Sequence, residues 1–224
     1  MLKAFREWQH RRRLKRYSAM KPQEVFGTIF TGNKWKGAES RSGKGSDLSQ
    51  TRDLIETLPA FLREHGVRRF LDVPCGDFNW MQHADLSGID YTGGDIVPGL
   101  IEANKRFARD DVRFMVLDLI EDEHPEADLV MVRDCLVHLS FAHARGAIEN
   151  IRRSPVRWLL TTHFPEATEN ADIVTGQWRA LNLERPPFSF PPPRATLVES
   201  LAPVEARPKT LALWSVADLP AMRS

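Results

Sequence analysis

Apolar positions along the chain follow two repeats, the alternation typical of strands and the wider spacing typical of amphipathic helices. Apolar blocks predict strands at residues 68–73, 89–94, 112–118, 127–134 and 156–162, and a closing antiparallel pair at 195–201 and 210–216. Helical spacing predicts helices at residues 49–64, 98–109 and from Ser140 onward. Such alternation is typical of a parallel sheet with helices on both faces. The sequence therefore predicts an α/β fold with a seven-stranded, mostly parallel sheet in a three-layer α/β/α sandwich.

The helix expected at residues 49–64 carries its own boundary signals. Ser49 is a favourable N-cap residue, and Gly66 can end the helix by adopting a left-handed conformation. Pro59 lies inside the helix and removes one backbone donor, so we expect a kink or a break there. Apolar residues on one face of this helix are expected to pack on the sheet.

Two segments lie outside the alternating pattern. Residues 27–46 are rich in glycine, which predicts a loop that either closes over a ligand as a lid or simply connects two elements. Residues 165–195 contain five prolines between positions 186 and 193, so we expect a long ordered loop on the substrate side. A single domain is therefore expected at residues 25–224, preceded by a basic helical arm at residues 1–24.

Charge is balanced over the whole chain but not along it. The sequence has 31 Lys and Arg against 30 Asp and Glu, so it lacks the field of a polyanion-binding protein, and nucleic acid is not indicated as a partner. Residues 1–21 hold eight basic residues and one acid, Glu7. A helix of this kind can make weak contact with an anionic membrane surface, or it can be a solvated arm.

Cysteine content and hydropathy indicate the compartment. Two cysteines, Cys75 and Cys135, are too few for a disulfide framework and fit a reducing environment. No apolar run approaches the roughly 18 residues of a spanning helix. We therefore expect a cytoplasmic enzyme with no structural metal, and the sequence leaves its oligomeric state open.

Acidic residues end three of the predicted strands. Residues 68–95 predict a strand, a tight turn, a helical segment and a second strand, with Asp72 just before the turn. Ligands of open α/β sheets bind in the crevice at the carboxyl ends of such strands. Asp95 follows the second strand at about the 20-residue offset at which a carboxylate accepts hydrogen bonds from ribose hydroxyls. Asp118 ends the third strand, and the ligand is expected to carry a ribose.

Three stretches carry a resemblance to a known family. They are residues 71–80 (LDVPCGDFNW), 133–140 (RDCLVHLS) and 178–183 (WRALNL). With the seven-strand layout, they resemble class I S-adenosylmethionine-dependent methyltransferases, and more closely a small family of such enzymes, over roughly residues 35–218. The resemblance implies a Rossmann-like class I methyltransferase fold and S-adenosylmethionine as cofactor. It also implies methyl transfer to an oxygen or nitrogen on a small polar molecule or glycan precursor.

The resemblance implies a position around the cofactor for each candidate residue. Asp72 and the turn after it would face the methionine part, and Asp95 would bind the ribose. Ile96 would lie against the adenine, and Asp118 with Leu119 would meet its edge. The full cofactor-binding set expected is Asp72, Pro74, Cys75, Gly76, Asp95, Ile96, Asp118, Leu119, Arg133 and, reaching a carboxylate from the lid loop, Arg41.

The cofactor already carries an activated methyl group, so the protein has to align the acceptor and remove a proton from it. Asp134 and His138 follow the fourth predicted strand and are the expected catalytic bases. An imidazole with an intrinsic pKa of about 6.5 suits this role, although His138 can equally be a helix-start residue bonded to backbone. The residues expected on the substrate side are Trp80, His163, Trp178, Arg179 and Asn182, with Arg179 favouring an acceptor that carries a carboxylate or phosphate.

Two other classes of function stay open. A non-catalytic binding module would use the basic arm, and a Rossmann oxidoreductase would bind NAD or NADP in the turn after the first strand. A dinucleotide turn needs three glycines, of which Gly76 alone is present, and Asp72 would repel a pyrophosphate. Pro74 and Phe78 also depart from the methyltransferase pattern, in which small residues let the cofactor approach.

Overall fold

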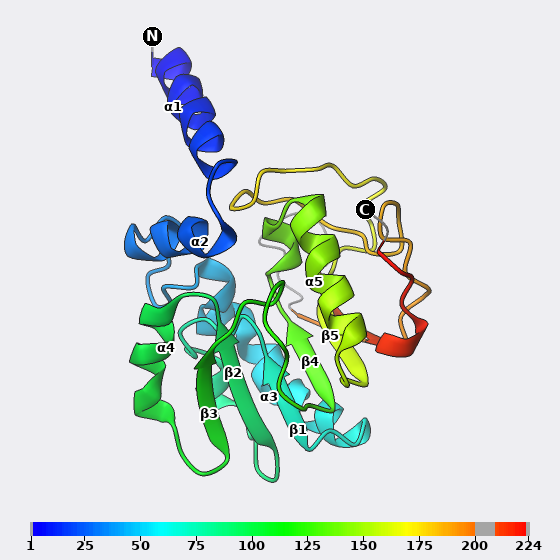
Figure 1. Ribbon diagram of the computed structural model, residues 1–224. Coiled ribbons are helices and arrows are strands. Elements are labelled where there is room, and N and C mark those ends of the chain that lie inside the picture. Colours follow the sequence, from blue (N-terminus) through cyan, green and yellow to red (C-terminus); the bar gives the residue numbers. More distant parts are fainter. Residues whose placement is uncertain (1, 200–208, 223–224) are drawn as a thin grey trace.

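The computed structural model describes residues 2–199 and 209–222. Seven strands form one mixed sheet in the order β3-β2-β1-β4-β5-β7-β6 (Figure 1). The first five neighbours in this order run parallel, and β7 is antiparallel to both β5 and β6. The strands are β1 (Arg69–Asp72), β2 (Asp90–Asp95), β3 (Val112–Val116), β4 (Leu129–Val132), β5 (Trp158–His163), β6 (Ala195–Val198) and β7 (Thr210–Ser215).

The predicted α/β fold with a mostly parallel seven-stranded sheet is confirmed. The closing antiparallel pair is present as β6 and β7. Positions 200–201 of the strand predicted at 195–201 lie outside the described residues.

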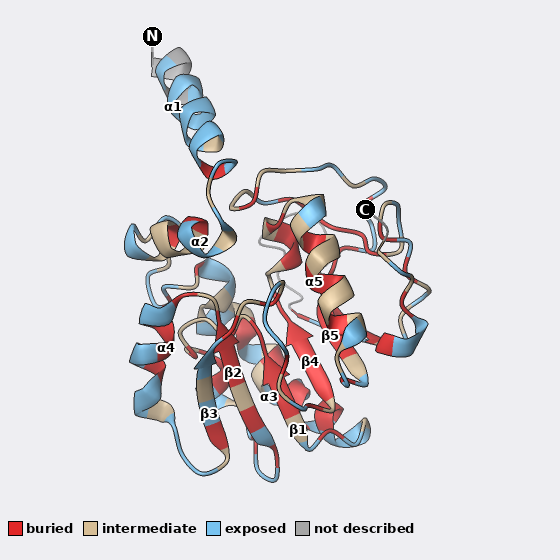
Figure 2. Ribbon diagram, in the orientation of Figure 1, coloured by how far each residue is buried: buried red, intermediate tan, exposed pale blue. Residues whose placement is uncertain are grey.

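The core has two layers, one on each face of the sheet, because successive side chains of a strand point to opposite faces. Phe70 of β1 packs with α3 (Leu48–Glu64), whereas the next residue, Leu71, packs with α5 (Phe141–Arg153). Figure 1 shows α5 in front of the sheet and α3 behind it, and Figure 2 shows the central strands buried. The helices α4 (Pro98–Asn104), which contacts β2 and β3, α1 (Leu2–Tyr17) and α2 (Pro22–Thr31) complete the described α-helices.

Helix α3 differs from its sequence-based prediction at two points. It begins at Leu48 after Asp47, not at Ser49, because the Glu39 carboxylate accepts a hydrogen bond from the Leu48 amide at 2.9 Å. Pro59 lies inside the helix without splitting it, since its buried face is fixed against the sheet. The predicted end is confirmed, with Gly66 at φ +67° just past the C-cap.

The connection from β1 to β2 lacks the helical segment that the sequence predicts. Residues 73–89 contain only a short 3-10 turn, because Gly76 and Phe78 adopt positive φ values of 57° and 58°. Phe78 is buried in an aromatic cluster, with ring centroids 5.3 Å from Tyr91 and 5.1 Å from Phe114. The 3-10 turn within residues 73–89 is Met81–His83, and further short 3-10 turns lie at Lys44–Ser46, Lys105–Phe107, which ends the helix predicted to reach residue 109, Leu136–His138 and Val216–Asp218.

The N-terminal segment forms two helices, not one arm. Helix α1 stands away from the body of the molecule (Figure 1), with Phe5 and Trp8 half-exposed and stacked at a centroid distance of 6.0 Å. Tyr17 at its base is buried. Helix α2 buries Val25 and Ile29, so the predicted boundary at residue 24 falls inside it. None of the described helices is both long and apolar enough to cross a membrane.

The loop at residues 165–194 contains no helix or strand, as the prolines predict. It is nevertheless packed, because Phe188 and Phe190 are buried in the α5-side core. The Trp214 indole of β7 donates a hydrogen bond to the Pro191 carbonyl at 2.7 Å. The loop is therefore anchored to the antiparallel end of the sheet.

Candidate active site

A cavity of about 1120 Å³ lies at the carboxyl ends of the parallel strands. Its lining includes the residues that directly follow β1, β2, β3 and β4. Asp72, Asp95 and Asp118 all line it, so the three acids singled out in the sequence share one site. The cavity also takes side chains from α1, α2 and the loop before α3, which close it on the side facing away from the sheet.

Asp72 is buried at the end of β1 and receives one short hydrogen bond. The Tyr91 hydroxyl donates to its carboxylate at 2.8 Å. Burial raises the pKa of Asp72 to about 7, more than the Tyr91 hydrogen bond and the Arg133 charge lower it. The site therefore holds a desolvated acid that a bound cation would stabilise in its charged form.

Asp95 is buried at the end of β2 and ties two turns together. Its carboxylate accepts hydrogen bonds from the Val97 amide at 2.9 Å and the Gly76 amide at 3.2 Å. Burial raises the pKa of Asp95 to about 6 in spite of these bonds. Asp118 is less buried, and its carboxylate accepts from the Ile120 amide at 2.9 Å.

Apolar residues line the cavity beside these acids. Ile96 and Leu119, both predicted to contact the adenine, lie on its wall with Leu100 and Leu117. Cys75 and Cys135 line it too, and burial raises the pKa of both thiols, so both are protonated and poor nucleophiles.

The loop at residues 40–42 is fastened to the turn after β1 through Asp77. The Asp77 carboxylate accepts hydrogen bonds from the Ser40 hydroxyl at 2.9 Å and the Arg41 amide at 2.7 Å, and the Ser42 hydroxyl accepts from the Asp77 amide at 3.0 Å. Gly76 is required here, because a Cβ would lie 2.2 Å from the Ser42 Oγ. Arg41 lines the cavity, with its guanidinium 5.7 Å from the centre of the Phe30 ring.

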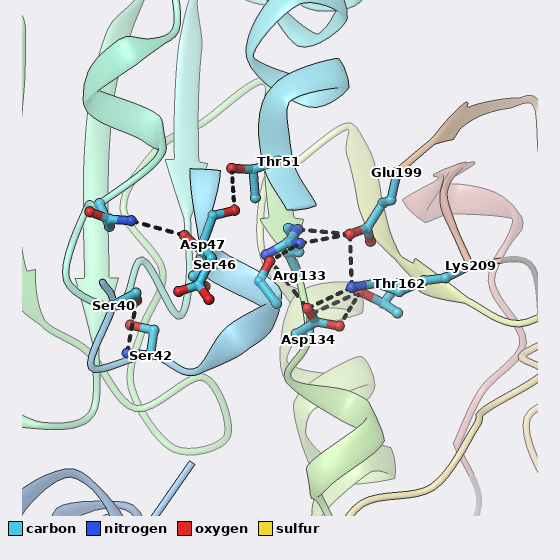
Figure 3. A network of polar contacts seen from close by, with 12 residues as sticks. Ser40, Ser42, Ser46, Asp47, Thr51, Arg133, Asp134, Thr162, Glu199 and Lys209 are labelled. Atoms are coloured by element: carbon cyan, nitrogen blue, oxygen red, sulfur yellow. Dashed lines mark hydrogen bonds and ion pairs between the residues drawn. The ribbon is translucent and has the colours of Figure 1, made fainter. Parts of the chain in front are cut away.

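Four charged side chains form a network across the cavity wall, and they point toward one another in Figure 3. The Glu199 carboxylate accepts from Arg133 Nε at 3.0 Å and pairs with Lys209 Nζ at 2.8 Å, and Lys209 also pairs with Asp134 at 2.7 Å. Although burial raises the pKa of Asp134, the charges of Lys209 and Arg133 outweigh it and hold that pKa below its usual range. Asp134 is therefore a paired anion and a weak base.

His138 presents one free ring nitrogen. Its Nδ1 lies 2.7 Å from the Gln177 carbonyl oxygen. Because a carbonyl only accepts, Nδ1 carries the proton and Nε2 keeps its lone pair in the neutral ring. Burial lowers the pKa of His138, so the ring is neutral at pH 7. The residue lines the cavity, and its ring centroid lies 5.4 Å from that of Trp35.

Two of the five residues expected on the substrate side line the cavity, Trp80 and Trp178. Trp80 is buried and lies under the Arg133 guanidinium, with 5.4 Å between that group and the ring centre. Trp178 is 44% exposed, and its ring packs edge-on against Phe164.

The other three expected substrate residues lie outside the cavity lining and hold the fold together. The Arg179 guanidinium donates to the Leu139 carbonyl at 2.6 Å. Asn182 donates to two carbonyls of its own loop, at 3.0 and 2.9 Å. His163 is buried in the core, where its Nδ1 accepts from the Leu183 amide at 3.3 Å and its Nε2 lies 3.2 Å from Glu184.

Sequence reasoning missed four residues that shape the site. Tyr91 binds Asp72 and Gln177 orients His138, while Glu199 and Lys209 pair with Arg133 and Asp134. The pairing partners are 66 and 75 positions apart in the chain, so no local spacing indicates them. Within residues 2–199 and 209–222, no group of three or more His, Cys, Asp and Glu side chains is placed to hold a metal ion.

Comparison with known proteins finds similar folds among solved structures, although the sequence itself matches none of the known families. No family model and no curated protein matches the sequence. Among solved structures, a 1,6-didemethyltoxoflavin-N1-methyltransferase from Burkholderia thailandensis with bound S-adenosylhomocysteine is 17% identical over 87% of this chain and 89% of that one, with a TM-score of 0.60. The magnesium protoporphyrin IX methyltransferase from Synechocystis with bound S-adenosylmethionine is 15% identical over 86% and 98%, with a TM-score of 0.57.

A third structure extends the likeness to almost the whole chain. Human N-acetylserotonin methyltransferase in complex with S-adenosylmethionine is 15% identical over 93% of this chain and 66% of that one, with a TM-score of 0.58. These likenesses show a shared fold. The chain therefore has the Rossmann-like fold of class I methyltransferases, with the cavity at the carboxyl edge of its sheet.

The buried charge of Asp72 predicts a stability that depends on pH. Its pKa of about 7 lies above the ordinary value of 3.8, so ionisation destabilises the folded state, with a penalty that grows from about pH 4 and is complete above pH 7. Asp72→Asn keeps an acceptor for Tyr91 and removes this penalty. We expect the variant's advantage in unfolding free energy over the wild type to grow by about 1–3 kcal/mol between pH 5 and pH 8.

Urea denaturation of the ligand-free proteins at both pH values measures this difference. Asp90→Asn, at the exposed start of β2, is the matched control and should show no pH-dependent advantage. An Asp72→Asn advantage that stays constant or shrinks with rising pH would contradict the assignment.

Proposed function

We propose that the protein is an S-adenosylmethionine-dependent methyltransferase that acts on an oxygen or nitrogen of a small polar molecule, glycan precursors included. One observation carries this proposal: Asp72, Asp95 and Asp118 converge on a single cavity at the carboxyl edge of the sheet. Support comes from the shared fold, since similar structures hold S-adenosylmethionine or S-adenosylhomocysteine.

The residues around the cavity fit the cofactor group by group. Asp72 is desolvated and has no hydrogen-bonded cation in the described part of the chain, so it would hold the methionine ammonium, and Arg41 would hold its carboxylate. Asp95 would accept from the ribose hydroxyls, and Asp118 from the adenine amine between the walls formed by Ile96 and Leu119. At about 1120 Å³ the cavity exceeds the roughly 300–1,000 Å³ of common ligand pockets, which leaves room for an acceptor.

The chain contributes alignment, exclusion of water and a base. The cofactor supplies the activated methyl group, so no covalent catalysis by the protein is required. His138 Nε2 would take the proton that the acceptor loses, because Nδ1 already donates to Gln177. Asp134, also predicted as a base from the sequence, forms an ion pair with Lys209 and would instead hold the cavity wall in position. Arg133 would also hold the wall in position, since its guanidinium forms an ion pair with Glu199.

The described structure disfavours a dinucleotide-binding oxidoreductase. Such enzymes place the pyrophosphate at the N-terminus of a helix that follows the first strand. Here residues 73–89 contain only the 3-10 turn at Met81–His83. The Asp72 carboxylate also lines the cavity at this point, where it would repel the phosphates.

Removal of the Asp95 carboxylate tests the cofactor assignment. We expect Asp95→Ala to weaken S-adenosylhomocysteine binding by about 10- to 100-fold in isothermal titration calorimetry, because a charge-assisted acceptor for the ribose is lost. Asp90→Ala removes an exposed carboxylate from the same strand and should leave the affinity unchanged. Full affinity in a folded Asp95→Ala protein would remove the ribose assignment.

Replacement of His138 separates proton transfer from binding. We expect His138→Ala to retain S-adenosylhomocysteine affinity while transfer of tritiated methyl groups to a cell extract falls by about 10²- to 10⁴-fold. In the wild type, activity should hold to a lower pH than an ordinary imidazole allows and then fall, because the lowered pKa delays protonation of the base. His83→Ala, an exposed histidine outside the cavity lining, is the control. Equal loss of binding and transfer would make His138 a structural residue.

A further inference from the structure

Charge in the cavity is divided between its two sides. The strand ends contribute aspartates. Three of them, Asp72, Asp95 and Asp118, have no cation in hydrogen-bond contact among the residues that the structure describes. The segment from residue 13 to residue 50 forms the opposite side, which is called here the N-terminal wall. Its charged lining residues are all cations: Arg13, Lys34, Arg41 and Lys44.

Arg13 and Lys34 flank one buried aromatic residue of this wall. Arg13 precedes Tyr17 by one helical turn and so lies on the same face of α1. Lys34 Nζ lies 3.1 Å from the Tyr17 hydroxyl and 5.5 Å from the centre of its ring. The Arg13 guanidinium lies 3.0 Å from the His10 imidazole nitrogen Nδ1. Both cations thus contact uncharged or weakly basic groups. They line the cavity while exposed to solvent, and these contacts give neither of them a neutralising carboxylate.

Trp35 connects the region of these cations with the proposed base, because it follows Lys34 in the chain and packs on the cluster that contains Tyr17. The Trp35 ring is 5.4 Å from the His138 ring and 6.3 Å from the Phe26 ring. Trp178 also lines the cavity and is partly exposed. A flat group that lies on this surface would have its reactive atom near His138 and its far end near Arg13 and Lys34.

We propose that the methyl acceptor carries an anionic group, a carboxylate or a phosphate, which Arg13 and Lys34 bind while its flat part lies against Trp35. This inference rests on the proposed methyltransferase function and adds the substrate class. The acidic strand ends suit a cationic cofactor, and the basic N-terminal wall suits an acceptor of opposite charge. Arg41 would bind the cofactor carboxylate and not the acceptor, and Lys44 would add positive charge to the same wall.

A pair of dyes that differ by one charge tests the proposal. Anilinonaphthalenesulfonate carries a sulfonate, and phenylnaphthylamine has the same rings without it. In fluorescence titrations of the full chain saturated with S-adenosylhomocysteine, we expect the anionic dye to bind about tenfold more tightly than the neutral one. The double variant Arg13→Gln/Lys34→Gln should lose most of this preference and keep its affinity for the neutral dye.

The control removes the same number of positive charges, both from helix α1. Arg11→Gln/Lys15→Gln alters two exposed residues of α1 that do not line the cavity, and it should keep the preference. Arg13→Lys/Lys34→Arg should restore it. Equal binding of the two dyes to the wild type, or an equal loss in both Gln double variants, would overturn the proposal. The two hypotheses can fail independently. Absence of S-adenosylhomocysteine binding in calorimetry would contradict the methyltransferase function, and the dye comparison on the ligand-free protein would still test the anion site.

Discussion

Two buried carboxylates govern the whole site, and within residues 2–199 and 209–222 neither has a cationic hydrogen-bond partner. Asp72 receives a bond from the Tyr91 hydroxyl, and Asp95 receives bonds from two backbone amides. Their pKa values rise to about 7 and about 6 because burial removes water that would stabilise the charged forms. A fold gains no stability from such groups, so they are best explained by a ligand that completes their coordination.

The rest of the site keeps these acids buried and accessible to a ligand. Asp77 fastens the loop at residues 40–42 against the turn after β1, which places the N-terminal wall opposite the strand ends. The network of Arg133, Glu199, Lys209 and Asp134 joins segments far apart in the chain on the remaining side. Because each of these four charges is paired, the wall they form is close to neutral, and the field in the cavity comes from the unpaired groups.

The features predictable from sequence were local ones. Strand positions follow from apolar periodicity, and the acids at 72, 95 and 118 follow from their places at strand ends, so both could be assigned before the structure. Arg179, Asn182 and His163 were expected in the site but bond to their own loop or core, because an irregular loop gives no periodicity from which side-chain direction can be derived. Lys209 was missed since its partner Asp134 is 75 positions away.

Thermal unfolding with two candidate ligands tests the central claim most directly, namely that the buried acids form an adenosyl-cofactor site. A ligand that binds only the folded state at a hundredfold excess over its Kd adds about 2.7 kcal/mol of stability, which raises the Tm by about 5–10 °C in a protein of this size. The account predicts such a rise with S-adenosylhomocysteine and none with NAD. A rise with NAD and an unchanged Tm with S-adenosylhomocysteine would contradict it.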